Sequence, residues 1–180
     1  MKVLIVFYSR TGNTRRAGEA VAEELRAAGC EVAAEELVDR KNRRGLRVWS
    51  AGIKDATLKH TTEIEPVGAD VAAFDVVVAG TPLWAGTVVP AVRTFLNAYR
   101  NEIRQVAFFC TMLGLPDNRS FGAMTKVCGR EPVARMALID HHIIRNDPDK
   151  FLSRTSRFAR TIAEAGGSDK SDQEQSAPAS

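Results

Sequence analysis

The sequence predicts a single α/β domain in which a five-stranded parallel sheet has helices on both faces. Strand-length apolar runs alternate with amphipathic segments of helical length along the chain. Most of these runs are apolar at consecutive positions, as in strands that are covered on both faces. The length of 180 residues favours one domain, and strands that alternate with helices form parallel sheets.

The first two strands and the helix between them lie near the start of the chain. Val3–Tyr8 is a continuous apolar run, which predicts a buried strand. The following helix places small and apolar side chains on one face, at Ala17, Ala20, Val21, Leu25 and Ala28. Glu31–Val38 contains three acidic residues, so we expect a strand at the edge of the sheet.

The middle of the chain contains two further buried strands. Asp75–Gly80 and Val106–Cys110 both include short apolar runs. The helix between them begins at Pro90, because proline fits the first helical turn, where its missing N–H would have no partner. The buried face of this helix is formed by Val92, Phe95, Leu96 and Tyr99.

The last helices and the fifth strand follow in the same order. A helix near Arg119–Cys128 precedes the strand Arg135–Ile139. Asp147 is suited to cap a helix that has Pro148 in its first turn. One face of that helix is formed by Phe151, Leu152, Thr155, Phe158, Ala159 and Ile162.

Two segments fall outside this alternation. Residues 39–70 form an insertion before the third strand, and residues 39–60 contain seven basic and two acidic side chains, an excess larger than the net charge of +3. A solvated loop explains this segment, and binding of an acidic partner or of nucleic acid is the alternative. Residues 166–180 contain almost nothing to bury, which predicts a disordered tail after a domain at 1–165.

The composition excludes several classes of protein. Hydrophobic residues make up 44% and charged residues 26% of the chain, as in ordinary globular proteins. The three cysteines show no C-x-x-C spacing, so neither a disulfide scaffold nor a metal site is expected. No apolar run approaches the roughly 20 residues of a membrane span. Because no A-x-A-like site follows Val3–Tyr8, we expect a strand there rather than a signal peptide, and a cytoplasmic protein.

In parallel sheets of this kind, ligands bind beyond the carboxyl ends of the strands, where the strand order reverses. The loop after the first strand reads Ser9-Arg10-Thr11-Gly12-Asn13-Thr14. Gly12 permits a tight turn, so backbone N–H groups at the start of the helix can converge on a phosphate, and the three hydroxyl groups can donate to it. The loop lacks the Walker A and G-x-G-x-x-G patterns. A cluster that only caps the helix is the alternative.

The loops after the third and fourth strands complete this edge of the sheet. The first of them reads Thr81-Pro82-Leu83-Trp84-Ala85-Gly86. Trp84 offers a flat face for stacking on a planar ring, and covering the sheet edge is its alternative role. The other loop reads Thr111-Met112-Leu113-Gly114. Its hydroxyl and N–H groups can bond the edge of such a ring, and its apolar side chains can pack on it. A plain strand-to-helix turn is the alternative.

The first loop resembles the signature S/T-x-T-G-x-T of the flavodoxin-like family, which it matches in full. The order of elements is similar over roughly residues 2–165. The resemblance implies a three-layer sandwich with strand order 2-1-3-4-5 and a bound FMN. It implies that Ser9–Thr14 hold the FMN phosphate and that Thr81–Gly86 contact the isoalloxazine ring, with a backbone group near Gly86 as the partner of flavin N5. Thr111–Gly114 would lie at the pyrimidine edge of the ring.

The chain departs from this family in three respects, one of which is the long insertion before the third strand. Residues 111–114 contain none of the acidic and aromatic side chains that repel the anionic reduced flavin in this family. Reduction of the flavin should therefore be easier. The sequence pI of 8.9 differs from the strongly acidic character of flavodoxin carriers.

Three functions follow as hypotheses. The first is a carrier that passes electrons through non-covalently bound FMN to a redox partner protein, and it is slightly preferred. The second is an FMN-dependent oxidoreductase that acts on NAD(P)H and a quinone. The third is a non-redox module for a phosphorylated ligand or nucleic acid, although no nucleic-acid module is recognisable. No catalytic side chain is assigned. His141-His142 has no third ligand at useful spacing, and Cys110 is expected to pack in the core.

Overall fold

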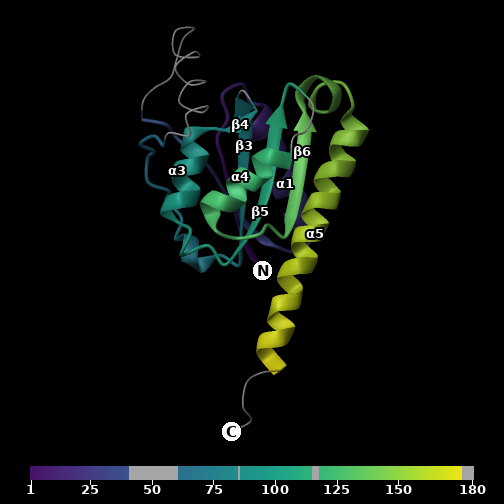
Figure 1. Ribbon diagram of the computed structural model, residues 1–180. Helices are drawn as coiled ribbons and strands as arrows, with labels where there is room; N and C mark the ends of the chain where they lie inside the picture. Colours follow the sequence, from purple (N-terminus) through teal and green to yellow (C-terminus); the bar gives the residue numbers. More distant parts are fainter. Residues whose placement is uncertain (41–60, 85, 115–117, 176–180) are drawn as a thin grey trace.

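The computed structural model describes residues 1–40, 61–84, 86–114 and 118–175. One sheet has helices on both faces (Figure 1), and its strand order is β2-β1-β3-β5-β6. These five strands are parallel, whereas the short β4 pairs antiparallel with β3. In chain order the elements are β1 (Lys2–Phe7), α1 (Asn13–Ala27), β2 (Glu31–Glu36), η1 (Val71–Ala73), β3 (Val76–Trp84), β4 (Thr87–Val88), α3 (Pro90–Ala98), β5 (Gln105–Met112), α4 (Asn118–Cys128), β6 (Ala134–Ile139), η2 (Asp140–Ile144) and α5 (Pro148–Gln175). The predicted α/β class and strand order are confirmed, with β4 in addition.

The sheet is buried on both faces. In β1, Val3 and Ile5 pack in the core shared with α1 and α5, whereas Leu4 and Val6 pack in the core shared with α3 and α4. This alternation follows from the period of two along a strand. Because both faces are covered, the central strands are apolar at consecutive positions. Within the described ranges, no helix is long and apolar enough to cross a membrane.

Gly80 in β3 allows a close approach between the sheet and an aromatic ring. A Cβ atom at this position would lie 2.1 Å from Cζ of Phe109, a ring that is fully buried. Phe109 also meets Phe158 of α5 edge-to-face, with ring centroids 6.5 Å apart. Only glycine leaves room for Phe109 here, which explains a glycine inside a central strand.

The third and fourth parallel strands are longer than the sequence predicts. The sequence ends them at Gly80 and Cys110, but β3 extends to Trp84 and β5 to Met112. The extension is paired on both sides: Pro82 aligns with Thr111 of β5, and Trp84 aligns with Thr87 of β4. The predicted loop after the third strand is therefore a β-hairpin, which turns at Gly86 with φ +72°.

The two segments that interrupt the predicted pattern have different outcomes. Residues 41–60 of the basic insertion lie outside the described residues. Its flanks are joined by antiparallel hydrogen bonds of 3.0 Å from Arg40 N to Glu63 O and from Glu65 N to Val38 O. The tail predicted from residue 166 is corrected in part, because the backbone of α5 continues as a helix to Gln175. No proline interrupts the helix before Pro178, and most residues of this segment other than glycine tolerate a helix.

Candidate functional site

The three predicted loops meet at the carboxyl edge of the sheet. The Oγ1 atoms of Thr14 at the start of α1 and Thr111 near the end of β5 are 2.8 Å apart and buried. Tyr8, which follows β1, donates its backbone N–H to the Gly80 carbonyl at 3.2 Å. The loop after β1 is thus bonded to both neighbouring strand ends, and the site residues from distant parts of the sequence lie together.

The loop after β1 has the geometry of an anion-binding turn. Gly12 precedes α1 in the left-handed conformation, with φ +88°. The Ser9 hydroxyl oxygen accepts the Arg15 N–H at 3.2 Å, so its own proton is available to another acceptor. N–H groups in the first turn of a helix have no intrahelical partner and favour negative charge. This donor set fits a phosphate group.

Trp84 at the end of β3 contacts two side chains of the loop after β1. Tyr8 meets its ring edge-to-face, with centroids 5.7 Å apart. The Arg10 guanidinium carbon lies 6.0 Å from the centroid of the indole, within the range of a cation–π contact. The indole therefore lies beside the predicted phosphate-binding loop, as a stacking residue for a ring attached to that phosphate must.

Two helix residues that the sequence analysis missed fix the β3–β4 hairpin. Ser120 of α4 is 1% exposed and donates its hydroxyl to the Gly86 carbonyl at 3.0 Å. Arg93 of α3 donates Nη2 to the Val88 carbonyl at 3.0 Å, and burial lowers its pKa. An arginine on the apolar face formed by Val92 and Phe95 was the available sequence signal for this role.

The predicted site residues divide into accessible and buried ones. Accessible side chains include Leu113, which is 70% exposed. Thr81 is fully buried, and its Oγ1 accepts the Val89 N–H at 3.4 Å, so its side chain cannot contact a ligand. Thr14 and Thr111 are also buried, and their hydroxyls bind each other. Of the predicted residues, Ala85 lies outside the described part of the chain.

Space for a ligand remains at all three loops. A Cβ atom built on Gly12, Gly86 or Gly114 would meet no atom of the described residues within 4 Å. These glycines therefore face open space, in contrast to Gly80. The open turns, the neutral phosphate donors and the adjacent indole together fit FMN, the group that the sequence resemblance implies.

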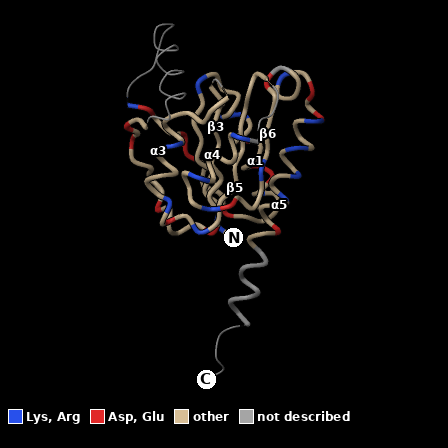
Figure 2. The backbone as a smooth tube through the Cα atoms, in the orientation of Figure 1, with Lys and Arg blue, Asp and Glu red and all other residues tan. Residues whose placement is uncertain are grey.

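Arginines dominate the charge at this edge. Arg10 lies over Trp84, and Arg16 of α1 lies 5.2 Å from the ring centroid of Phe151. Two carboxylates near these loops are paired with arginines: Glu36 with Arg15 and Asp140 with Arg145. Over the rest of the described backbone, basic and acidic residues are interspersed (Figure 2).

The other residues that the sequence singled out do not join the site chemistry. Burial raises the pKa of the Cys110 thiol to about 12, so it stays protonated at neutral pH and is a poor nucleophile. Residues Asp140–Ile144 form the π-helical turn η2, in which His142 is exposed. In the part of the chain that the structure describes, no three His, Cys, Asp or Glu residues are grouped to hold a metal.

Known proteins resemble the chain at two levels. A family model described as NADPH-dependent FMN reductase matches residues 1–115, which include all three loops. Among solved structures, a flavoprotein from Lactobacillus acidophilus in complex with FMN is 20% identical with a TM-score of 0.64, over 76% of this chain and 92% of that one. A flavodoxin from the domain Archaea is 16% identical with a TM-score of 0.59, over 93% and 99%. A flavodoxin from Streptococcus pneumoniae is 18% identical with a TM-score of 0.58, over 92% and 99%. No curated protein sequence matches.

Proposed function

Because the chain belongs to the NADPH-dependent FMN reductase family and is therefore an FMN-binding redox protein, we propose that it is an FMN-dependent oxidoreductase that takes electrons from NAD(P)H. The observation that supports this most directly is the extent of the family match. It covers β1 to β5 and so includes every loop at the candidate site. The electron carrier, which the sequence alone slightly favoured, is the second candidate, supported by the flavodoxin-like fold.

The residues of the first loop would hold the phosphate of FMN. Ser9 and the first N–H groups of α1 face the turn that Gly12 opens, and they offer neutral donors with the partial positive charge of the helix N-terminus. Arg10 adds a full positive charge beside this turn. In this assignment Thr14 does not donate to phosphate directly, but joins the loop to β5 through Thr111.

The hairpin and the loop after β5 would enclose the ring. Trp84 supplies an aromatic face for the flavin ring. The backbone at Gly86 can approach the ring closely because glycine has no side chain. Leu113 is exposed beside this space and can cover part of it. When bound, FMN supplies the redox chemistry, because it accepts a hydride equivalent from NAD(P)H and releases electrons to an acceptor.

The charge at the site supports an enzyme that works with anionic partners. FMN and NAD(P)H both bear phosphate groups, and the arginines of this edge attract such ligands. The carboxylates of Glu36 and Asp140 are each neutralised by a bonded arginine. These two side chains therefore add little net negative charge that would repel reduced FMN.

The test uses the full chain reconstituted with FMN and freed of excess flavin by gel filtration. We expect retained flavin absorbance that NADPH bleaches without oxygen, and catalytic turnover when a quinone is then supplied. Retained flavin that neither NADPH nor NADH reduces would contradict the reductase and favour the carrier. A protein that retains no flavin and quenches no FMN fluorescence would contradict both redox functions.

Replacement of Trp84 tests the assignment of the ring site. We expect Trp84→Ala to weaken FMN binding by about 1–3 kcal/mol, the range of an aromatic stack on a flat ring. Trp84→Phe should recover part of the loss, because a smaller aromatic face remains. The measurement is a fluorescence titration with FMN. Unchanged affinity in Trp84→Ala would remove this residue from the site.

A further inference from the structure

The turn that follows the edge strand β6 holds an arginine in a fixed position. Asp140 begins η2, and Arg145 directly follows it. The Arg145 side chain donates from Nε to Asp140 Oδ1 at 2.9 Å and from Nη2 to Oδ2 at 3.4 Å. Its backbone N–H also donates to the Asp140 carbonyl at 3.1 Å. The guanidinium is thus positioned by a carboxylate and by the backbone of the same turn.

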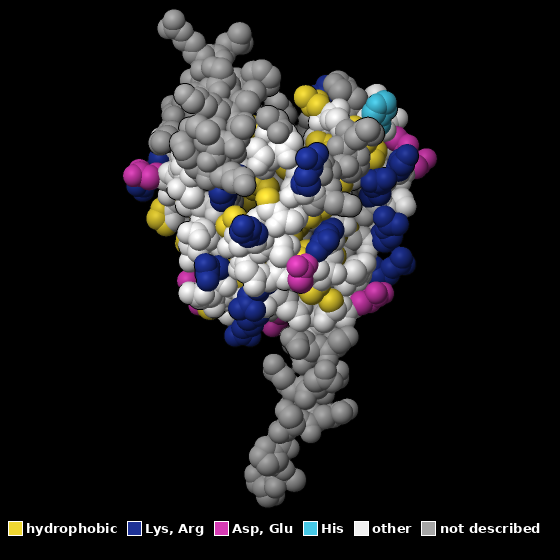
Figure 3. All heavy atoms as spheres, in the orientation of Figure 1, with side chains coloured by type: hydrophobic (Ala, Val, Ile, Leu, Met, Phe, Trp, Pro, Cys, Tyr) yellow, Lys and Arg dark blue, Asp and Glu magenta, His cyan; other side chains and the backbone are white. Residues whose placement is uncertain are grey.

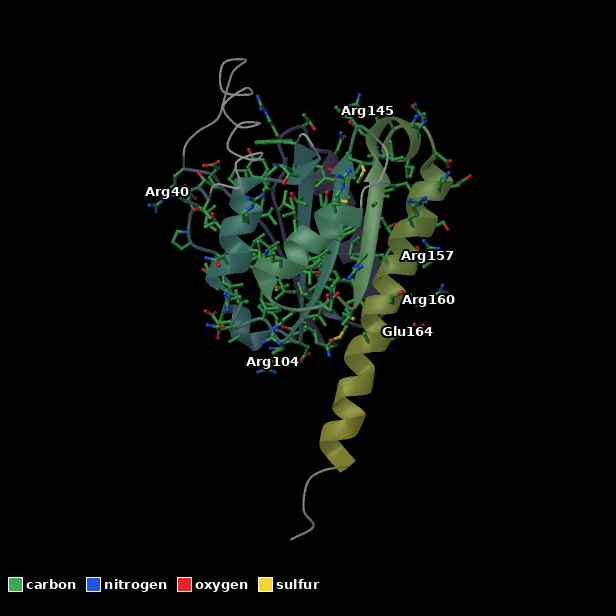
Figure 4. All side chains as sticks on the ribbon, viewed as in Figure 1. Arg40, Arg104, Arg145, Arg157, Arg160 and Glu164 are labelled. Carbon is green, nitrogen blue, oxygen red and sulfur yellow. The ribbon has the colours of Figure 1, made fainter. Side chains whose placement is uncertain are left out.

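This turn lies at the same edge of the sheet as the candidate site. Ile139, the last residue of β6, is aligned with Met112 of β5, and Asp140 follows it at once. The turn therefore borders the loop 111–114, which would contact the flavin ring. Figure 4 shows Arg145 at the end of the molecule where the strands terminate.

The pair is built so that the arginine remains available to a ligand. The side chain of Asp140 is 8% exposed, whereas that of Arg145 is 52% exposed. A guanidinium has five N–H donors in a planar fork. Asp140 occupies the edge formed by Nε and Nη2, so Nη1 keeps its donors for a second partner. An arginine oriented in this way can donate charge-assisted hydrogen bonds to an oxyanion such as phosphate with little further loss of side-chain freedom.

Charged side chains of both signs surround the turn. Asp147 is engaged as the cap of α5, because its carboxylate accepts the Lys150 N–H at 2.9 Å. Asp149, Lys150 and His142 are exposed on the same segment. On the neighbouring α1, the positively charged Arg16 lies against Phe151 of α5.

We infer that Arg145, held by Asp140 beside the flavin site, binds a phosphate group of the pyridine-nucleotide donor. The inference rests on the proposed reductase function and names a residue for substrate recognition. Two phosphates of the donor share this chemistry: the pyrophosphate, which NADPH and NADH both have, and the 2′-phosphate, which only NADPH has. Asp140 acts as the positioning residue in this assignment.

The experiment measures nucleotide binding to the FMN-loaded protein without turnover. NADP⁺ and NAD⁺ are titrated by calorimetry into the unmodified chain, Arg145→Ala, Arg145→Lys and Asp140→Asn. We expect Arg145→Ala to bind NADP⁺ roughly 10-fold or more weakly, as for the loss of a charge-assisted hydrogen bond. Arg145→Lys should recover part of the affinity, because lysine restores the charge but not the fork. Asp140→Asn should give a smaller loss.

Arg157→Ala is the matched control, because it removes the same charge from a different surface. Figure 4 shows Arg157 on α5, away from the end where Arg145 lies. Figure 3 shows Lys and Arg side chains gathered along α5. If the loss of any one positive charge weakened nucleotide binding through long-range electrostatics, Arg157→Ala would show this weakening too.

The outcomes separate the sources of the phosphate. A loss for NADP⁺ alone would assign Arg145 to the 2′-phosphate, and an equal loss for both nucleotides would assign it to the pyrophosphate. Unchanged binding in Arg145→Ala, an equal loss in Arg157→Ala, or loss of FMN from Arg145→Ala would overturn the inference. If the unmodified FMN-loaded chain binds neither nucleotide, the proposed donor itself fails, which the first titration reveals independently of any variant.

Discussion

Gly80 is a position where any side chain would displace a buried ring. A Cβ atom there would overlap Phe109, at 2.1 Å from Cζ and 2.4 Å from Cε1. We expect Gly80→Ala to destabilise the protein by about 1–3 kcal/mol, because overpacking in a filled core forces neighbours from their rotamers. The midpoint of thermal unfolding by circular dichroism should fall by several degrees.

Two further variants test whether overlap with Phe109 causes the loss of stability in Gly80→Ala. Gly122→Ala is the control, because a Cβ atom at this exposed position of α4 meets nothing within 4 Å, and alanine favours a helix. It should keep or raise the unfolding midpoint. Adding Phe109→Leu to Gly80→Ala should cost less than the sum of the two single changes, because the smaller side chain relieves the overlap. Additive costs would contradict the proposed cause.

At the scale of single elements, the β3–β4 hairpin depends on bonds from two helices. Ser120 and Arg93 bind the carbonyls of Gly86 and Val88 at 3.0 Å each. We expect Ser120→Ala to weaken FMN binding several-fold, because the hairpin would lose one of the contacts that hold it in position before the ligand arrives. The unfolding free energy should fall by only about 1 kcal/mol, the scale of one hydrogen bond.

The control for this prediction is Ser153→Ala on the exposed surface of α5, which should change neither quantity. Fluorescence titration with FMN and chemical denaturation give the two readouts. If Ser120→Ala lowered stability but left the FMN affinity unchanged, the hydrogen bond would serve the fold alone, and the hairpin would not need it to receive the ring.

The elements were predictable where burial alone shapes the sequence. β1 and β5 are apolar at consecutive positions because both faces of the sheet are covered, and Pro90 marks the start of α3. The ends of β3 and β5 were not predictable. Pro82 and Gly86 usually indicate loops, but the end of β3 is extended because it pairs with Thr111 of β5 and with β4. Local sequence does not encode this pairing.

At the scale of the whole molecule, the sequence identified the loops of the candidate site but not how they are held together. The turn at Gly12, where we propose that phosphate binds, was predictable from its spacing and from its place between a strand and a helix. The bond between Thr14 and Thr111 was not, because it joins residues 97 positions apart and uses hydroxyls that the sequence alone assigned to a ligand. Arg145 was missed for a similar reason: its role depends on a π-helical turn, and that turn has no simple sequence pattern.

We propose that the folded domain ends near residue 166, and this can be tested on the whole molecule. Ile162 of α5 is fully buried, and Gly166 lies so close to Met1 that a Cβ atom would overlap its sulfur. Figure 1 shows that α5 then continues beyond the sheet. We expect a chain that ends at Gly167 to unfold within about 2 °C of the 180-residue chain and to bind FMN equally well, because Ile162 is the last buried hydrophobic side chain in the part of α5 whose side chains are described.

A shorter truncation provides the opposite expectation. A chain that ends at Arg160 lacks Ile162, whose removal from the core should cost at least about 2–5 kcal/mol, and also lacks the contact between Gly166 and Met1. It should unfold at a much lower temperature or fail to fold. If the chain ending at Gly167 also lost several degrees or bound FMN more weakly, the segment from residue 168 onward would belong to the folded domain, and the boundary proposed at 165 would be too early.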